Sequence, residues 1–195
     1  MAKKVKYLVI HCTATPEGRD VTADDIARMH KGALKNADGT YTFLGVKYSA
    51  SKLMSQILTL PSGKNIAADK TNGRGWRQFG YSDMVMLDGS IVELVPNNND
   101  QIVDVWEITN GVAGINDVSR HIVYVGGTDK NGKAKDTRTD AQKKTLTHFV
   151  HYVVSKCPDI KIAGHYQFEN KACPSFKVPE FCREIGIAEK NIYTP

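Results

Sequence analysis

Residues 164–176 read GHYQFENKACPSF, a stretch that places His165 and Cys173 eight residues apart with Lys171 between them. Imidazole and thiolate groups are ligands that zinc binds readily in proteins. Two such ligands and a cation in one short segment predict half of a zinc hydrolase site, with a further ligand elsewhere in the chain.

The missing ligand is expected near the other end of the chain. Residues 7–15 read YLVIHCTAT, an apolar run of β type that delivers His11 where the strand meets a Thr-rich turn. A catalytic zinc usually takes three protein ligands and keeps a fourth position open for water. His11, His165 and Cys173 form such a set.

Length and composition indicate an ordinary globular protein. The 195 residues suffice for one domain with a real core, or for a core domain that carries a large insertion. The formal charge of +5 favours an anionic partner such as a bacterial wall polymer or a nucleic acid. The basic residues are scattered along the chain, so charge alone does not choose between these partners.

The first residues of the chain indicate where the protein is made. The start MAKKVKYLVIHC has a short apolar run and no signal-peptide core, so synthesis in the cytoplasm without a signal peptide is expected. No window is long and apolar enough to predict a membrane span.

The chain has four cysteines without a CxxC pair, which favours separate thiols over disulfides. They are Cys12, Cys157, Cys173 and Cys182.

Strands interleaved with helices predict an α/β single domain with a central mixed β-sheet flanked by helices, and the zinc in a surface cleft. Apolar runs predict strands at residues 5–10, 121–125 and 160–163, and Asp88-Gly89 predicts a hairpin between residues 83–87 and 90–95. Capping patterns at Thr22 and Thr139 predict helices to His30 and to about Lys156, and a terminal helix is expected over residues 178–185.

A segment from about residue 32 to 75 breaks this pattern. It is rich in Gly, Ser, Lys and Asn, with a short strand expected at residues 41–44 and a helix at residues 51–58. We interpret it as an insertion in a single domain of residues 1–195. Because it directly precedes residue 81, we expect it to shape contacts with the substrate. Alternatively it is a tolerated surface elaboration, since long insertions cost little closure entropy.

Four blocks of sequence together resemble the zinc-dependent N-acetylmuramoyl-L-alanine amidases, of the type found in phage lysozyme-like amidases and peptidoglycan-recognition proteins. The blocks are VIHCTAT, GYSDMVMLDGSIVE, VYVGG and HYQFENKACPSF, in the family's order. The resemblance covers roughly residues 5–31 and 74–185.

The resemblance implies a role for each matching position. His11, His165 and Cys173 correspond to the zinc ligands, and Tyr81 and Lys171 to the catalytic residues. The family often has Gly-Tyr-His where this chain has Gly-Tyr-Ser, so Ser82 departs from the pattern. A substrate contact made by that histidine is therefore not expected here.

The chemistry of amide hydrolysis explains why such residues are needed. Zinc lowers the pKa of a bound water from about 15.7 to roughly 7. A Cys173 thiolate neutralises part of the metal's charge, and Lys171 beside the scissile carbonyl restores a positive charge for the oxyanion. Tyr81 is expected to orient the attacking water or to donate to the same oxygen.

Single residues of these types are more often structural, and the other histidines and Cys12 are interpreted in that way. His30, His148 and His151 lie on expected helices without an HExxH pattern, so core or surface roles are expected. His121 lies in an expected strand, from which it approaches the cleft as a possible partner of a ligand. Cys12 follows His11 in a strand, so its side chain is expected on the opposite face.

Three other functions compete with a wall-degrading amidase. A peptidoglycan-binding module without catalysis would typically lack the cysteine ligand, and a cytoplasmic muropeptide-recycling amidase usually carries aspartate there, so Cys173 argues against both. Residues 49–52 read SASK and match the S-x-x-K pattern of penicillin-recognising serine hydrolases, but no K-T-G element accompanies it.

The expected protein is therefore a phage or prophage endolysin with Zn²⁺ as cofactor. Its expected partner is peptidoglycan or a muropeptide, with no nucleic acid. We expect a monomer that acts on the cell wall after release from the cytoplasm.

Overall fold

The computed structural model describes residues 1–195, which form two compact units. The first unit comprises Met1–Asp20 and Tyr81–Pro195, and the second comprises Val21–Gly80. The insertion expected at residues 32–75 lies within the second unit. None of the helices is both long and apolar enough to cross a lipid bilayer.

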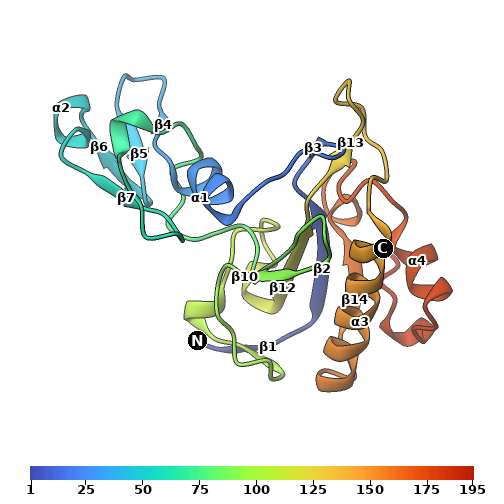
Figure 1. The fold of residues 1–195 in the computed structure, drawn as a ribbon. Helices are drawn as coiled ribbons and strands as arrows, with labels where there is room; N and C mark the ends of the chain where they lie inside the picture. Colours follow the sequence, from blue (N-terminus) through green and yellow to red (C-terminus); the bar gives the residue numbers. More distant parts are fainter. The chain divides into compact units, whose positions relative to one another are not determined.

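The first unit is built on a five-stranded sheet (Figure 1). The strand order is β10 (Ile91–Glu93), β9 (Asp83–Val85), β12 (Ser119–Tyr124), β2 (Tyr7–Cys12) and β14 (Lys161–Gly164). Strands β9, β12, β2 and β14 run parallel, and β10 is antiparallel to β9. This confirms the predicted α/β fold with a mixed sheet.

One face of the sheet packs in the hydrophobic core, and the other carries His11. Alternation along β2 directs Leu8, Ile10 and Cys12 into the main hydrophobic core, where they meet apolar residues of α3 (Asp140–Lys156) and α4 (Val178–Glu184). Figure 1 shows both helices on the same side of the sheet. His11 is equally buried but points to the other face, so it is available to a site there.

Shorter elements complete the first unit. They are β1 (Lys3–Lys4), which pairs with β11 (Ile102–Val103), β3 (Thr15–Pro16), which pairs with β13 (Gly127–Thr128), and the 3-10 turns η2 (Val105–Glu107), η3 (Asn116–Val118), η4 (His165–Gln167) and η5 (Glu189–Asn191).

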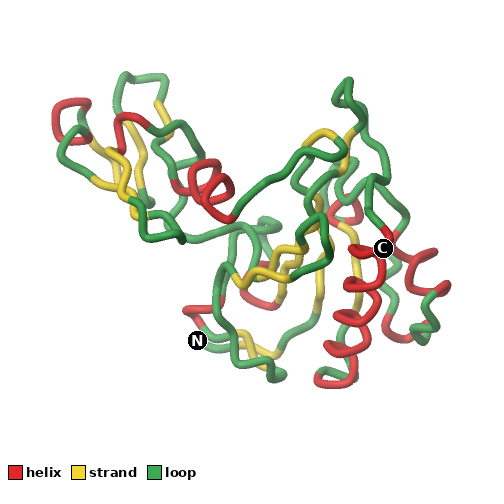
Figure 2. Tube along the Cα trace, in the orientation of Figure 1, coloured by secondary structure: helices red, strands yellow, loops and turns green.

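The second unit consists of short elements joined by loops (Figure 2). In chain order these are α1 (Ala23–Lys31), β4 (Leu34–Lys35), β5 (Tyr41–Phe43), β6 (Val46–Tyr48), α2 (Ala50–Leu53), β7 (Ile57–Thr59), β8 (Asn65–Ala67) and η1 (Ala68–Lys70). Strands β4, β5 and β6 form an antiparallel meander, and β7 pairs with β8.

The caps predicted from the sequence are present. Thr22 and Thr139 each accept a hydrogen bond from the backbone N–H three residues on, and Asp25 and Gln142 complete the two capping boxes. The prediction of a helix over residues 51–58 is wrong in its second half. The chain leaves α2 after Leu53 and enters β7, in which only the middle residue of the three is buried.

Candidate metal centre

The two histidines that were predicted as ligands come from neighbouring parallel strands. His11 is the fifth residue of β2, and His165 directly follows β14. Gly164 of β14 pairs with Ile10 of β2, so the next residue on each strand reaches the same end of the sheet. This register brings together two side chains that are 154 positions apart in sequence.

Cys173 lies in a loop near the same end of the sheet. The backbone N–H of Tyr166 donates to the carbonyl of Cys173 at 2.8 Å, and the Tyr124 hydroxyl donates to the carbonyl of Pro174 at 2.7 Å. The backbone N–H of Cys12 donates to Cys173 Sγ at 3.3 Å, a contact that sequence analysis did not foresee. The loop therefore presents the sulfur toward the histidine pair.

The donor atoms of these three residues converge. His11 Nδ1 lies 3.1 Å from His165 Nδ1 and 3.7 Å from Cys173 Sγ, and all three ligand atoms lie within 4.8 Å of one another. Zn–N bonds of about 2.0 Å and Zn–S bonds of about 2.3 Å in a tetrahedron require donor separations of about 3.3 to 3.7 Å. The donor set is one that zinc binds, and the two printed separations, 3.1 Å and 3.7 Å, lie close to this range.

The protonation of the three ligands is compatible with metal binding. Burial, with a smaller contribution from the Lys171 charge, lowers the pKa of His165, so its imidazole is neutral near pH 7. Hydrogen bonding with the Cys12 thiol, together with burial, raises the pKa of Cys173. A metal that binds this sulfur therefore displaces a proton.

His121 of β12 is the outer partner of His11. Its Nδ1 lies 3.0 Å from His11 Nε2, and burial lowers the pKa of its imidazole to about 3, so His121 is neutral. Gly111 makes room for the ring, since a Cβ at residue 111 would lie 2.2 Å from His121 Nδ1. Sequence analysis considered His121 as a possible partner of a ligand, and the structure brings it to hydrogen-bond distance.

Tyr81 lies beside the ligands and Ser82 does not face them. The ring centroids of Tyr81 and His11 are 5.1 Å apart. Ser82 is buried, and its hydroxyl contacts the Asp83 carboxyl at 2.7 Å and the carbonyl of His121 at 2.9 Å. Ser82, the residue that departs from the family pattern, thus makes its hydrogen bonds within the fold.

Lys171 is held by a carboxylate that sequence analysis missed. Its Nζ lies 2.7 Å from Glu169 Oε2, and the same oxygen lies 3.4 Å from His165 Nε2. The hydrogen bond from Lys171 lowers the pKa of Glu169, which is therefore ionised near neutral pH. Lys171 is half exposed and borders a cavity of about 350 Å³.

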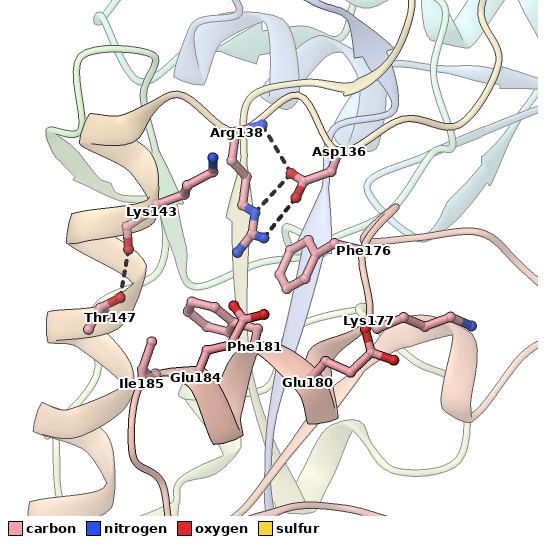
Figure 3. Close-up of a pocket in the computed structure, with 10 residues that line it drawn as sticks. All are labelled: Asp136, Arg138, Lys143, Thr147, Phe176, Lys177, Glu180, Phe181, Glu184 and Ile185. Carbon is pink, nitrogen blue, oxygen red and sulfur yellow. Dashed lines mark hydrogen bonds and ion pairs between the residues drawn. The ribbon is translucent and has the colours of Figure 1, made fainter.

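A second cavity, of about 380 Å³, lies between α3 and α4 and contains none of the three ligands (Figure 3). In it Arg138 is paired with Asp136 and stacks on Phe176, with 3.4 Å between the guanidinium carbon and the ring centroid. Arg138 and Asp136 are thus paired with each other in this cavity. The close-up shows no residue of the metal centre.

The remaining candidates from the sequence have structural contacts. The Ser49 hydroxyl caps α2 by accepting from the Lys52 N–H, which accounts for the S-x-x-K pattern without catalysis. His151 Nε2 donates to the carbonyl of Ile185 at 2.9 Å, and His148 is exposed on α3. Cys12 is buried in the core, as predicted, and its thiol also hydrogen-bonds with Cys173.

Comparison with known proteins agrees with this geometry. The family model described as N-acetylmuramoyl-L-alanine amidase matches residues 1–176. The endolysin of Enterobacteria phage K11 is 28% identical over 110 residues, which cover 56% of this chain and 68% of that protein. The endolysin of Escherichia phage T7 is 28% identical over 103 residues, which cover 53% of this chain and 63% of that protein.

Solved structures share the fold at low sequence identity. The amidase endolysin LysCS from Clostridium intestinale URNW has a TM-score of 0.57 at 16% identity, covering 95% of this chain and 86% of that one. Drosophila PGRP-LB has a TM-score of 0.54 at 16% identity, covering 96% and 88%. Because the family model spans most of the sequence, this chain belongs to the N-acetylmuramoyl-L-alanine amidase family.

Proposed function

We propose that this amidase is a zinc hydrolase in which His11, His165 and Cys173 hold the metal. The observation that carries the proposal is the convergence of these three donor atoms within 4.8 Å of one another. They come from two segments of the chain that are 154 positions apart at the histidines, and imidazole and thiolate are ligands that zinc binds readily.

The substrate is the amide bond between N-acetylmuramic acid and L-alanine in peptidoglycan, the bond that gives the family its name. Similarity to phage endolysins supports a wall-degrading lysin of phage or prophage type. In this proposal the protein acts as a monomer on the cell wall after release from the cytoplasm.

The residues around the metal have distinct tasks. Zn²⁺, when bound, supplies a Lewis acid and activates water for attack on the amide carbonyl. His121 holds the His11 ring by a hydrogen bond, so that His11 Nδ1 keeps its lone pair toward the other ligands. The Cys12 N–H stabilises negative charge on Cys173 Sγ.

Two further residues act on the substrate. The Lys171 ammonium stabilises the negative charge that develops on the carbonyl oxygen as the nucleophile adds. The Tyr81 hydroxyl orients the attacking water or donates a hydrogen bond to the same oxygen. The ring contact between Tyr81 and His11 supports the placement of this tyrosine beside the reacting atoms.

Digestion of purified peptidoglycan tests the proposal. Protein stripped with a chelator and reloaded with zinc is incubated with sacculi of several chemotypes, and the products are identified by mass spectrometry. We expect free stem peptides that begin with L-alanine, released only by the reloaded protein. The Cys173→Ala variant is expected to lose zinc and release together, whereas Cys182→Ala, which alters a buried thiol of α4, keeps both.

Other outcomes reject the proposal. Full release by the stripped protein excludes a zinc enzyme, and cleavage at another bond excludes this substrate. Muropeptide binding with no zinc and no cleavage indicates a binding module instead.

A further inference from the structure

The two histidine ligands have outer partners of different chemistry. His11 Nε2 meets the neutral and fully buried imidazole of His121. His165 Nε2 is itself buried and makes no hydrogen bond of normal length, so the carboxylate of Glu169 at 3.4 Å is the acceptor that it faces. One ligand is therefore supported by a neutral group, and the other by a charged one.

A single carboxylate oxygen of Glu169 lies close to both Lys171 and His165. Oε2 lies 2.7 Å from Lys171 Nζ as well as 3.4 Å from His165 Nε2. The backbone fixes this arrangement, because the Glu169 N–H donates to the carbonyl of His165 at 3.3 Å and the Lys171 N–H donates to the carbonyl of Glu169 at 2.8 Å. All three side chains thus belong to one short backbone segment, residues 165–171.

The chemistry of the contact selects one form of the histidine. A carboxylate only accepts hydrogen bonds, so the nitrogen of His165 that faces it carries the proton. The other nitrogen, Nδ1, then offers its lone pair toward His11 Nδ1 at 3.1 Å. The same carboxylate restrains a lysine whose side chain is otherwise half exposed.

We infer that Glu169 is a positioning residue that links the metal ligand His165 to the catalytic Lys171. It holds His165 with Nδ1 toward the metal and keeps the Lys171 ammonium beside the ligand loop. The inference rests on the proposed function, and it predicts that one side chain affects both metal affinity and turnover.

Two substitutions separate these effects. Glu169→Ala removes the acceptor and the charge, so zinc affinity is expected to fall about tenfold and kcat to fall with it. Glu169→Gln keeps an amide oxygen that accepts from His165, so zinc affinity stays within about threefold of the wild-type value while kcat falls through loss of the ion pair with Lys171. KM is expected to change little in either variant.

Zinc affinity is measured without substrate, by competition with a chromophoric chelator, and kcat and KM are measured on a soluble muropeptide. Glu184→Gln is the matched control, since it removes an exposed carboxylate on α4. Circular dichroism verifies that each variant is folded.

A double-mutant cycle tests the link to Lys171. In the Lys171→Ala background, Glu169→Gln should cause no further loss of kcat. Independent, multiplicative losses overturn the link. Wild-type zinc affinity in Glu169→Ala overturns the role at His165, and because this measurement needs no turnover, it is separate from any failure of the amidase proposal.

Discussion

His11 Nε2 lies 3.0 Å from His121 Nδ1, and this pair connects the metal centre to the middle of the sheet. The two residues lie on adjacent parallel strands, with His121 two positions before Val123, the partner of His11 in the register. If Nδ1 of His11 binds metal, Nε2 carries the proton and donates it to His121. In that arrangement His121 would fix the orientation and tautomer of His11 without touching the metal.

The first prediction concerns this pair. His121→Ala should weaken zinc binding by about 10-fold to 100-fold, the usual effect of losing an outer partner of a ligand. Affinity is measured by chelator competition on folded protein, with His148→Ala on the exposed face of α3 as the control. If both variants bind zinc like the wild type, the His11–His121 contact does not support the metal.

The second prediction concerns Lys171. Lys171→Ala should keep its zinc and lose about 100-fold or more in kcat, the magnitude typical of a lost oxyanion donor. Lys177→Ala is a matched control, because Lys177 borders the same cavity but has no contact with Glu169 among the ion pairs. Metal content and release of stem peptide are measured together. Normal turnover in Lys171→Ala is the result that contradicts an oxyanion role.

Much of the site was predictable because its motifs are local. GHYQFENKACPSF brings His165, Lys171 and Cys173 into one loop, and the strand run before His11 fixes the end of a buried strand. Thr22 and Thr139 were recognisable as caps because capping depends on residues three positions apart. The family resemblance then connected the segment that contains His11 with the segment that contains His165 and Cys173.

Other features depend on tertiary contacts that a single sequence does not encode locally. Nothing around Glu169 distinguishes it from a solvated surface carboxylate until the turn places it between His165 and Lys171. The contact from the Cys12 N–H to Cys173 Sγ joins residues 161 positions apart. The helix expected at residues 51–58 failed because alternating exposure at Ile57–Thr59 fits a strand paired with β8.

The third prediction concerns the insertion expected at residues 32–75. Its ends meet, since the Gly75 N–H donates to the carbonyl of Gly32 at 2.8 Å and the Gly73 N–H donates to that of Ala33 at 3.0 Å. Replacing residues 33–74 by two glycines should therefore leave a folded protein that still binds zinc. We expect slower digestion of intact sacculi, because the insertion is predicted to contact substrate.

Circular dichroism, zinc content and the rate of sacculus clearing are the measurements for this deletion. A folded deletion variant that clears sacculi at the wild-type rate shows that the insertion is a surface elaboration. An unfolded variant shows that residues 33–74 are required for the fold, which contradicts the first part of the prediction.

The last prediction concerns pH and His30 in the second unit. His30 packs against Trp76 and Phe79, and its Nδ1 accepts a hydrogen bond from the Gly80 N–H at 3.1 Å. Burial first, and then the positive charges of Arg74 and Lys31, lower the pKa of His30 from 6.5 to about 4. The native state therefore holds this imidazole neutral, whereas the unfolded chain protonates it below pH 6.5.

Stability from this group is fully present above pH 6.5 and is lost as the pH falls toward 4, because only the unfolded state gains the proton in that range. The shift corresponds to at most about 3 kcal/mol. His30→Asn keeps an acceptor for Gly80 and removes the titration, so its free energy of unfolding should depend less on pH. Urea unfolding of both proteins between pH 7.5 and 4.5 measures the difference, and parallel pH profiles would contradict a neutral buried His30.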